Sequence, residues 1–291
     1  MILFWNFDFG FLIFKSKIGN PKSKIDGSMT TFIAKIGENT IIRAKATAHL
    51  FALFWSVIRL ASQKSSWPRT TRNVFVRQIL FTGVEALQFV SLVAIITGLS
   101  VVIQAQIWLG KTGQSQMLGT ILVTVIVREL APLLVNFIII GRSGTAIAVE
   151  LANMKVLGEI HLLECQGIDP LLYLIIPRAL AMSVCVFCLT IWFIVISFGG
   201  GYLYGVLAGV GAGAPNLFIA NILRSVHFPD VISLLAKTFL PGLFTAIICA
   251  SEGISVGAAI TEVPQAATRA VVRSIAALFI LSVIVSILSY A

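Results

Sequence analysis

Two charged residues stand inside a long apolar run, and they are the first candidates for chemistry in this chain. Arg128 and Glu129 interrupt MLGTILVTVIVRELAPLLVNFIII, residues 117–140. An ionised side chain at the centre of a membrane helix costs about 2.5–3.5 kcal/mol, so such residues usually face a partner or a wet cavity. Neighbours on a helix point about 100° apart and cannot share one partner direction. The pair predicts a substrate-adjacent polar site, with a structural ion pair between helices as the alternative.

Pro132 follows this pair, and it should bend the helix or free a carbonyl because proline has no N–H to donate. A second isolated acid, Glu252, lies in a later apolar run. Lys237 is about 22 Å away from it along a helix, too far to be its partner. The sequence leaves Arg142 or a base from residues 269–273 as the partner of Glu252.

Other kinds of chemistry find no support in the sequence. No Walker A motif, nucleophile elbow or paired catalytic carboxylates occur, and the His and Cys residues lack the spacing of metal ligands. We therefore expect no catalytic residue, no metal and no cofactor in this chain. A membrane-embedded enzyme acting on lipids would need such groups, so that alternative is disfavoured.

The composition indicates what must hold these residues. Of 291 residues, 58% are hydrophobic and 11% are charged, against about 25% charged in soluble proteins. A helix needs about 20 apolar residues to cross a bilayer. Five runs are long enough, and we predict an all-α polytopic membrane protein with about five transmembrane helices at 83–108, 117–149, 173–209, 231–258 and 271–290.

The charge distribution predicts the orientation. The net charge of +9 lies in residues 1–80, because acids and bases balance from residue 81 onward. Basic segments beside spans face the cytoplasm, so we place the N-terminus inside. Lys111, Arg224 and Lys237 then fall on the outer side. Apolar residues alternate with the bases at helical spacing, which favours an interfacial helix over a nucleic-acid-binding arm.

The N-terminal part of the chain divides into two predicted segments. Residues 1–28 read as an extension, with Met29 as a candidate native start. Residues 29–80 read as a basic amphipathic segment on the membrane surface. Within it, residues 40–64 form an amphipathic helix, with Trp55 and Trp67 at headgroup level. The alternative for this helix, a short true span, is disfavoured because Arg59 interrupts its apolar run.

Small and apolar residues recur at helical spacing in two further patterns. Small residues let helix backbones approach closely in membranes, and we read Gly141, Gly144, Gly201 and Gly205 as packing positions. An apolar stripe on the first span shares one helix face. It either lines a cavity for acyl chains or packs against another helix, and it consists of Leu92, Ile95, Leu99 and Ile103.

The connection after the second span, residues 150–178, is too long for a simple turn. Apolar residues at helical spacing predict a short amphipathic helix over Met154–Gln166. Gly167 should end it as a cap, and Asp169-Pro170 should begin the next element. A helix of this kind at the cytoplasmic surface can dock in the groove of a soluble partner.

The run from Arg128 to Arg178 closely resembles the MlaE family of ABC transporter permeases. The family pattern is approximately RELxP…GRxGxAxxAExxxMxxxEQIxALxxxGxDPxxYLxxPR, and residues 261–274 also resemble the stretch before the family's last helix. The chain departs from the pattern at Ser143 and at Ile160-His161. The matching residues are Arg128, Glu129, Leu130, Pro132, Gly141, Arg142, Gly144, Ala146, Glu150, Met154, Glu159, Ile160, Leu163, Gly167, Asp169, Pro170, Tyr173, Leu174, Pro177 and Arg178.

The resemblance implies a permease domain over residues 81–291 that forms a homodimer in the inner membrane. It implies a cytoplasmic ABC ATPase that binds ATP and Mg²⁺, an MCE-domain protein and a STAS-domain protein as partners. The cargo would be phospholipid, or alternatively another hydrophobic molecule such as a sterol or an organic solvent. The short cytoplasmic helix would be the coupling helix to the ATPase, with contacts from Lys155, Glu159, Ile160, Leu163, Glu164 and Asp169.

We further expect that two copies enclose a cavity lined by the first, second and fifth spans. In this hypothesis the apolar stripe would carry acyl chains, and Arg128 or Glu129 would set the polarity near the headgroup. A scaffold that transports nothing would need no charge in the middle of a span, which counts against that reading.

Overall fold

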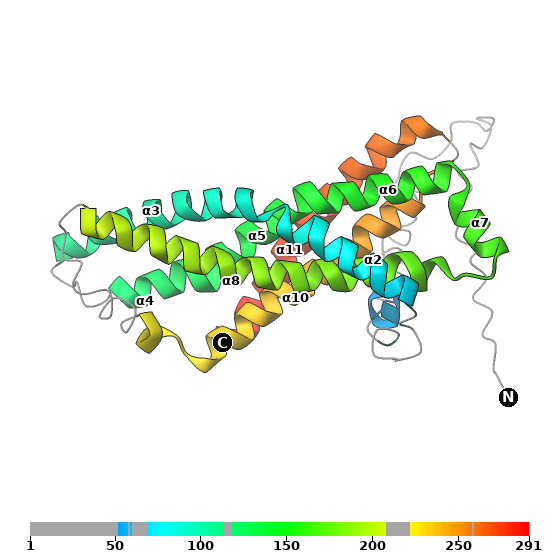
Figure 1. The fold of residues 1–291 in the computed structure, drawn as a ribbon. Helices are drawn as coiled ribbons and strands as arrows, with labels where there is room; N and C mark the ends of the chain where they lie inside the picture. Colours follow the sequence, from blue (N-terminus) through cyan, green and yellow to red (C-terminus); the bar gives the residue numbers. More distant parts are fainter. Residues whose placement is uncertain are drawn as a thin grey trace, which may run out of the picture. The chain divides into compact units, whose positions relative to one another are not determined.

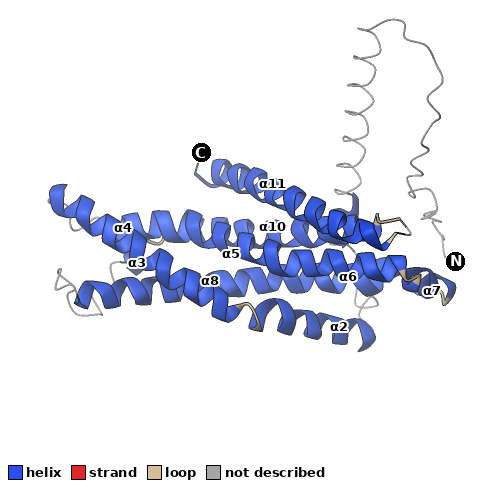
Figure 2. Ribbon diagram, turned by 90° about the horizontal axis from the view of Figure 1, so that it is seen from above, coloured by secondary structure: helices blue, strands red, loops and turns tan. Residues whose placement is uncertain are grey.

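A computed structural model describes residues 52–57, 59, 69–112, 118–207, 222–257 and 259–290. In these ranges all regular elements are helices (Figures 1 and 2). The predicted extension at 1–28 lies outside the described residues, and so does most of the predicted interfacial segment at 29–80, Trp67 included. Trp55 lies in the helical stretch 52–57 and is exposed.

Several helices follow one another without a break, joined by short segments of π-helix or 3-10 helix that carry the label η. Such segments are common where side chains are re-aimed at functional positions. The elements in chain order are α2 (Arg69–Ile79), η3 (Leu80–Val84), α3 (Leu87–Thr112), α4 (Leu118–Leu122), η5 (Val123–Leu130), α5 (Ala131–Ile139), η6 (Ile140–Gly144), α6 (Thr145–Val156), α7 (Glu159–Cys165), η7 (Leu171–Ile175), α8 (Ile176–Leu207), α10 (Phe228–Ile254), η8 (Ile260–Glu262) and α11 (Val263–Tyr290).

Within the described ranges, five helical stretches are long and apolar enough to cross a membrane, which confirms the predicted all-helical fold with five candidate spans. They are Arg72–Ala105, Gly119–Val156, Leu171–Val206, Phe228–Ile254 and Ile260–Ser289. The first and last begin well before the predicted positions 83 and 271. The first stretch includes α2 and η3, which are separated from α3 by a turn at residues 85–86. The last stretch includes η8 and the first turns of α11, where Arg269 and Arg273 bind Glu252 of α10.

Close backbone contact joins α3 and α8, which lie alongside each other (Figures 1 and 2). A Cβ added at Gly98 would overlap the backbone of Ser197, and one added at Gly201 would overlap the side chain of Val102. Ser197 Oγ also donates to the carbonyl of Ala94 at 3.0 Å. We call these contacts the close-packed seam.

The three other predicted packing glycines lie in different surroundings. A Cβ at Gly144 would lie 3.1 Å from Cys249 Sγ, so this residue faces α10 closely. Gly205 is buried within α8. Gly141 is exposed, and a Cβ there would meet no other atom of this chain within 4 Å. A packing role for Gly141 stays a prediction.

Candidate functional site

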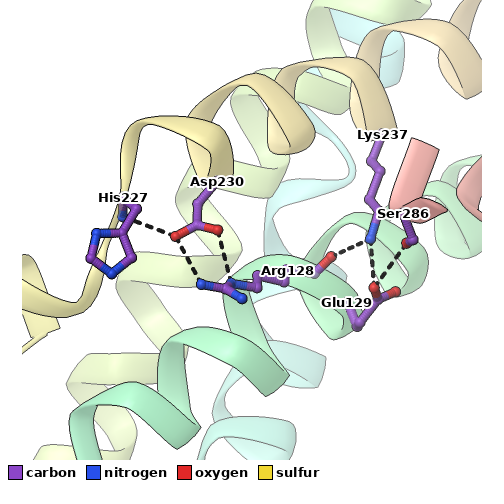
Figure 3. Close-up of polar contacts among 6 residues, drawn as sticks. All are labelled: Arg128, Glu129, His227, Asp230, Lys237 and Ser286. Carbon is purple, nitrogen blue, oxygen red and sulfur yellow. Dashed lines mark hydrogen bonds and ion pairs between the residues drawn. The ribbon is translucent and has the colours of Figure 1, made fainter. Parts of the chain in front are cut away.

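Arg128 lies in η5 and binds Asp230 in the first turn of α10 (Figure 3). Its Nε is 2.8 Å from Asp230 Oδ1, and its Nη2 donates to Oδ2 at 3.3 Å. The backbone N–H of His227 also donates to Oδ2, at 2.9 Å. Asp230 therefore caps the start of α10 and binds the guanidinium at the same time, which fixes that helix end against η5.

Glu129, the next residue, binds a different position on the same helix (Figure 3). Lys237 Nζ donates to Glu129 Oε1 at 2.6 Å and to the backbone carbonyl of Arg128 at 2.7 Å. From α11, Ser286 Oγ donates to the same carboxylate oxygen at 3.1 Å. The charge cluster of Arg128, Glu129, Asp230, Lys237 and Ser286 therefore joins three candidate spans.

The geometry follows from two simple spacings. Asp230 and Lys237 are two helical turns apart on one face of α10, whereas adjacent helical residues diverge by about 100°. Arg128 and Glu129 therefore each reach a different residue of α10. Pro132, two residues after the π-helix η5, has no N–H to donate to the preceding turn. Lys237 Nζ supplies a donor at this point, to the carbonyl of Arg128.

Exposure divides the cluster into two halves. The side chains of Asp230 and Lys237 are each 1% exposed, whereas those of Arg128 and Glu129 are 23% and 45% exposed. The α10 residues are thus fixed counter-ions inside the fold. The carboxylate of Glu129 is the most open of these four charged groups, and its charge and acceptor oxygens can meet a polar group of a ligand.

The positions of Lys237 and of the Arg128–Glu129 pair differ from those predicted from the sequence. Lys237 was assigned to the outer side of the membrane, but it is buried in the cluster within α10. Arg128 and Glu129 lie in the first third of the span Gly119–Val156 rather than near its middle. Asp230 and Ser286 were not singled out from the sequence. The spacing of Asp230 and Lys237, two turns apart with opposite charge, was a usable signal for Asp230.

Further ion pairs connect the helices outside the cluster. Glu252 binds Arg273, and Arg269 Nε lies 3.3 Å from its Oε2, so the base comes from 269–273. Arg142, the other candidate, instead binds Glu85 at 2.6 Å and donates to the carbonyl of Phe81. These contacts hold the start of α11 against α10 and hold η6 against η3 and the turn after it.

The apolar stripe belongs to a different helix pair from the charge cluster. Leu92 and Ile95 are exposed on α3, and Leu99 and Ile103 are half-buried. This helix packs mainly against α8, whereas the cluster joins η5, α10 and α11. The lining of a cavity by this stripe stays a prediction.

The predicted cytoplasmic helix over Met154–Gln166 is split in the structure. α6 continues to Val156, and α7 begins at Glu159, because Gly158 takes a left-handed conformation with φ of 77°. Gly167, with φ of 74°, ends α7 as predicted. Ile168 N–H donates to Leu163 O at 3.0 Å and Gly167 N–H to Glu164 O at 3.0 Å, the paired bonds of a Schellman motif.

The predicted coupling residues surround this short helix. Glu159, Glu164 and Asp169 are exposed, Lys155 and Leu163 are half-buried, and Ile160 is buried. Asp169 Oδ1 accepts from the N–H of Leu171 at 2.9 Å, so it starts the next element as expected. Leu162 and Ile168 add exposed apolar surface beside the acids. α7 therefore presents a mixed acidic and apolar surface at one end of the helices (Figure 1).

Among the described residues, no group of three or more His, Cys, Asp or Glu side chains is placed to hold a metal ion.

Comparison with known proteins gives one family over most of the chain. The model of the family "Permease MlaE" matches residues 75–288. A probable ABC transporter permease protein of Rickettsia typhi is 31% identical over 240 residues, which cover 82% of this chain and 90% of that protein. The "Intermembrane phospholipid transport system permease protein MlaE" of Haemophilus influenzae is 28% identical over 261 residues, 84% of this chain and 92% of that protein.

A plant protein is also similar. The "Protein TRIGALACTOSYLDIACYLGLYCEROL 1, chloroplastic" of Arabidopsis thaliana is 26% identical over 231 residues, 79% of this chain and 64% of that protein. The residues that the family model matches, 75–288, reach into all five candidate spans and include the charge cluster and α7.

Proposed function

The chain belongs to the MlaE family of ABC transporter permeases, and from that premise we propose that it moves phospholipids, or related lipids, between an inner and an outer membrane. It is a multi-pass membrane protein and a non-catalytic permease subunit, so ATP is hydrolysed by an ATPase partner. Phospholipid as the cargo is supported by the name of the H. influenzae relative. In this proposal the transport maintains the lipid asymmetry of the outer membrane.

The observation that carries the proposal is the half-exposed carboxylate of Glu129 inside the candidate spans, held by a lysine that is 1% exposed. Lys237 fixes this carboxylate, while nearly half of the Glu129 side chain, 45%, stays open. An open acid beside a partly open Arg128 suits the zwitterionic or anionic headgroup of a lipid.

We propose that two copies of the chain form the transport path in the inner membrane, with the N-terminus in the cytoplasm. Each copy contributes its charge cluster near the lipid headgroup and the apolar stripe of Leu92, Ile95, Leu99 and Ile103 along the acyl chains. Supporting the second role, Leu92 and Ile95 are exposed in the single chain. An MCE-domain protein on the outer side and a STAS-domain protein on the inner side complete the proposed assembly.

The test of this site is lipid transfer by the complex reconstituted with its ATPase. Glu129→Gln leaves the ammonium of Lys237 without its charged partner, and a charged hydrogen bond contributes about 1.5–3 kcal/mol. We expect lipid transfer to fall about tenfold or more in Glu129→Gln and to fall also in Arg128→Ala. The matched control is Glu85→Gln, which removes a carboxylate paired with Arg142 outside the cluster. Wild-type transfer in both cluster variants would refute the polar site.

The cargo class is tested by mass spectrometry of lipids that co-purify with the complex. Phospholipids enriched over the surrounding membrane support the proposal. Enrichment of a sterol or a hydrocarbon without phospholipid would instead favour the alternative cargo, because an apolar cavity alone does not distinguish headgroups.

We also propose that α7 receives the motion of the ATPase. Its two flanking glycines, Gly158 and Gly167, set it at an angle to α6, and it presents Glu159, Glu164 and exposed Leu162. Glu159→Lys together with Glu164→Lys should abolish co-purification of the ATPase through like-charge repulsion. Arg224→Glu reverses an exposed charge at the opposite end of the helices and should leave co-purification unchanged. Full ATPase recovery with the α7 variant would contradict the docking role.

A further inference from the structure

A proline inside α10 leaves a backbone carbonyl without its normal donor, and a second proline lies on the neighbouring helix. Pro132 lies in the first turn of α5, and Pro241 lies inside α10. In an α-helix the N–H of each residue bonds the carbonyl four residues earlier, and proline has no N–H. Pro241 therefore cannot bond the carbonyl of Lys237. In a membrane such a group must be satisfied by neighbouring helices or side chains.

The carbonyls of Lys237 and Arg128 each accept from a side chain on the other helix. Lys237 Nζ, from α10, donates to the carbonyl of Arg128 at 2.7 Å. In return, Asn136 Nδ2, from α5, donates to the carbonyl of Lys237 at 3.2 Å. Asn136 Nδ2 also donates to the carbonyl of Pro132 at 2.7 Å. We call the set Pro132, Asn136, Lys237 and Pro241 the proline clasp.

The amide of Asn136 is fixed by its surroundings. The residue is 1% exposed, and both of its acceptors are carbonyl oxygens, so only the nitrogen side of the amide can face them. A buried amide is costly unless it is hydrogen-bonded, and here both N–H groups have an acceptor. An apolar residue of similar size could fill the space but could not bond the carbonyl of Lys237.

We propose that Asn136 is a positioning residue for transport. By bonding the backbone carbonyl of Lys237, it fixes the point from which the lysine side chain reaches Glu129 and the carbonyl of Arg128. The lysine then holds the open carboxylate of Glu129 in place for the headgroup. This inference rests on the proposed function of the charge cluster, and it adds a residue that lies outside that cluster.

The role predicts a specific pattern of suppression. Asn136→Ala should lower lipid transfer about three- to tenfold, the range expected for one or two hydrogen bonds between membrane helices. Pro241→Ala restores an N–H for the carbonyl of Lys237, so the loss caused by Asn136→Ala should nearly disappear in that background. Pro132→Ala is the matched control, because it adds an N–H on α5 that does not reach the helical partner position of Lys237, and it should not suppress the loss.

A second comparison separates positioning from general packing. If Asn136 acts through Lys237, Asn136→Ala should cause no further loss of transfer in a Lys237→Met background. A packing role would instead add its full loss to that of Lys237→Met. Equal losses from Asn136→Ala in the Pro241→Ala and Pro132→Ala backgrounds would also overturn the proposal.

A readout without transport distinguishes failure of this inference from failure of the proposed function. In the purified full-length chain, labelling of Lys237 by an amine-reactive reagent is measured by mass spectrometry of its peptide. The rate should rise at least severalfold in Asn136→Ala and return to the wild-type value with Pro241→Ala added. An unchanged rate in Asn136→Ala overturns the inference. The expected labelling pattern with wild-type transfer in Glu129→Gln upholds the clasp and refutes the polar transport site.

Discussion

The close-packed seam between α3 and α8 and the charge cluster between η5 and α10 join helices by opposite means. In the seam, Gly98 lets the backbone of Ser197 approach so closely that a Cβ would not fit. In the cluster, Arg128 and Glu129 reach across to Asp230 and Lys237 through long side chains. Van der Waals contact depends steeply on distance, whereas long ionic side chains tolerate small shifts.

This difference indicates which contact is rigid and which can respond to a ligand. At Gly98 the two backbones touch directly, so no side chain there can change its rotamer to let the helices shift. In the charge cluster the side chain of Glu129 is exposed, so its carboxylate can bind a lipid headgroup and weaken its ion pair with Lys237. We therefore expect α3 and α8 to move as one unit, and lipid-dependent changes to occur at η5 and α10.

The largest effect on stability is expected from Lys237→Met, because Lys237 is the buried cation of the charge cluster. Loss of one partner of a fully buried ion pair costs about 3–5 kcal/mol, and because the Glu129 side chain that remains is 45% exposed, we expect a loss at the lower end of that range. The melting temperature of the purified protein should fall sharply. In Glu129→Gln with Lys237→Met both charges are gone, so much of the stability should return although lipid transfer stays low. Equal melting temperatures of the single and double variants would show that the ion pair is not the stabilising contact.

The next largest effect is expected in the seam. Gly98→Ala puts a Cβ into the backbone of Ser197, and overpacking of this kind costs about 1–3 kcal/mol. The melting temperature should fall, whereas transfer per folded molecule should stay near wild type. Gly199→Ala is the control on α8, since a Cβ there meets nothing within 4 Å. That variant should be neutral or slightly stabilising, because alanine is the better helix former. A loss of transfer larger than the loss of folded protein in Gly98→Ala would contradict a purely structural seam.

The same two regions show how far sequence reasoning reached. Apolar runs predicted the five spans, because length and composition decide whether a helix can cross a membrane. Arg128 and Glu129 stood out because charge in an apolar run is rare. Their partners could not be assigned, because nothing in one sequence states that η5 lies beside the face of α10 that carries Asp230 and Lys237. For the same reason the sequence left two candidates open for Glu252.

Helix ends were less predictable than helix centres. Gly158 lies inside a regular apolar pattern, and a glycine there is compatible either with a continuous helix or with a left-handed break. The structure has the break, with φ of 77°, so the predicted helix over Met154–Gln166 divides. α11 begins before the predicted position 271, and its first turns carry Arg269 and Arg273, which bind Glu252, one of the two pairings that the sequence left open.

The smallest effects are expected from replacing one serine by alanine in each of the two regions, the α3–α8 pair and the charge cluster. Ser91 on α3 accepts from Trp192 Nε1 at 2.8 Å, and Ser286 on α11 donates to Glu129 at 3.1 Å. Hydrogen bonds between membrane helices contribute about 0.6 kcal/mol on average, so Ser91→Ala and Ser286→Ala should lower the melting temperature slightly and by similar amounts. Their effects on lipid transfer should differ, because only Ser286 touches the open carboxylate. We expect a reduction of about threefold or less in Ser286→Ala and none in Ser91→Ala. Equal transfer in the two variants would mean that the distinction between a rigid seam and a responsive cluster does not extend to α11.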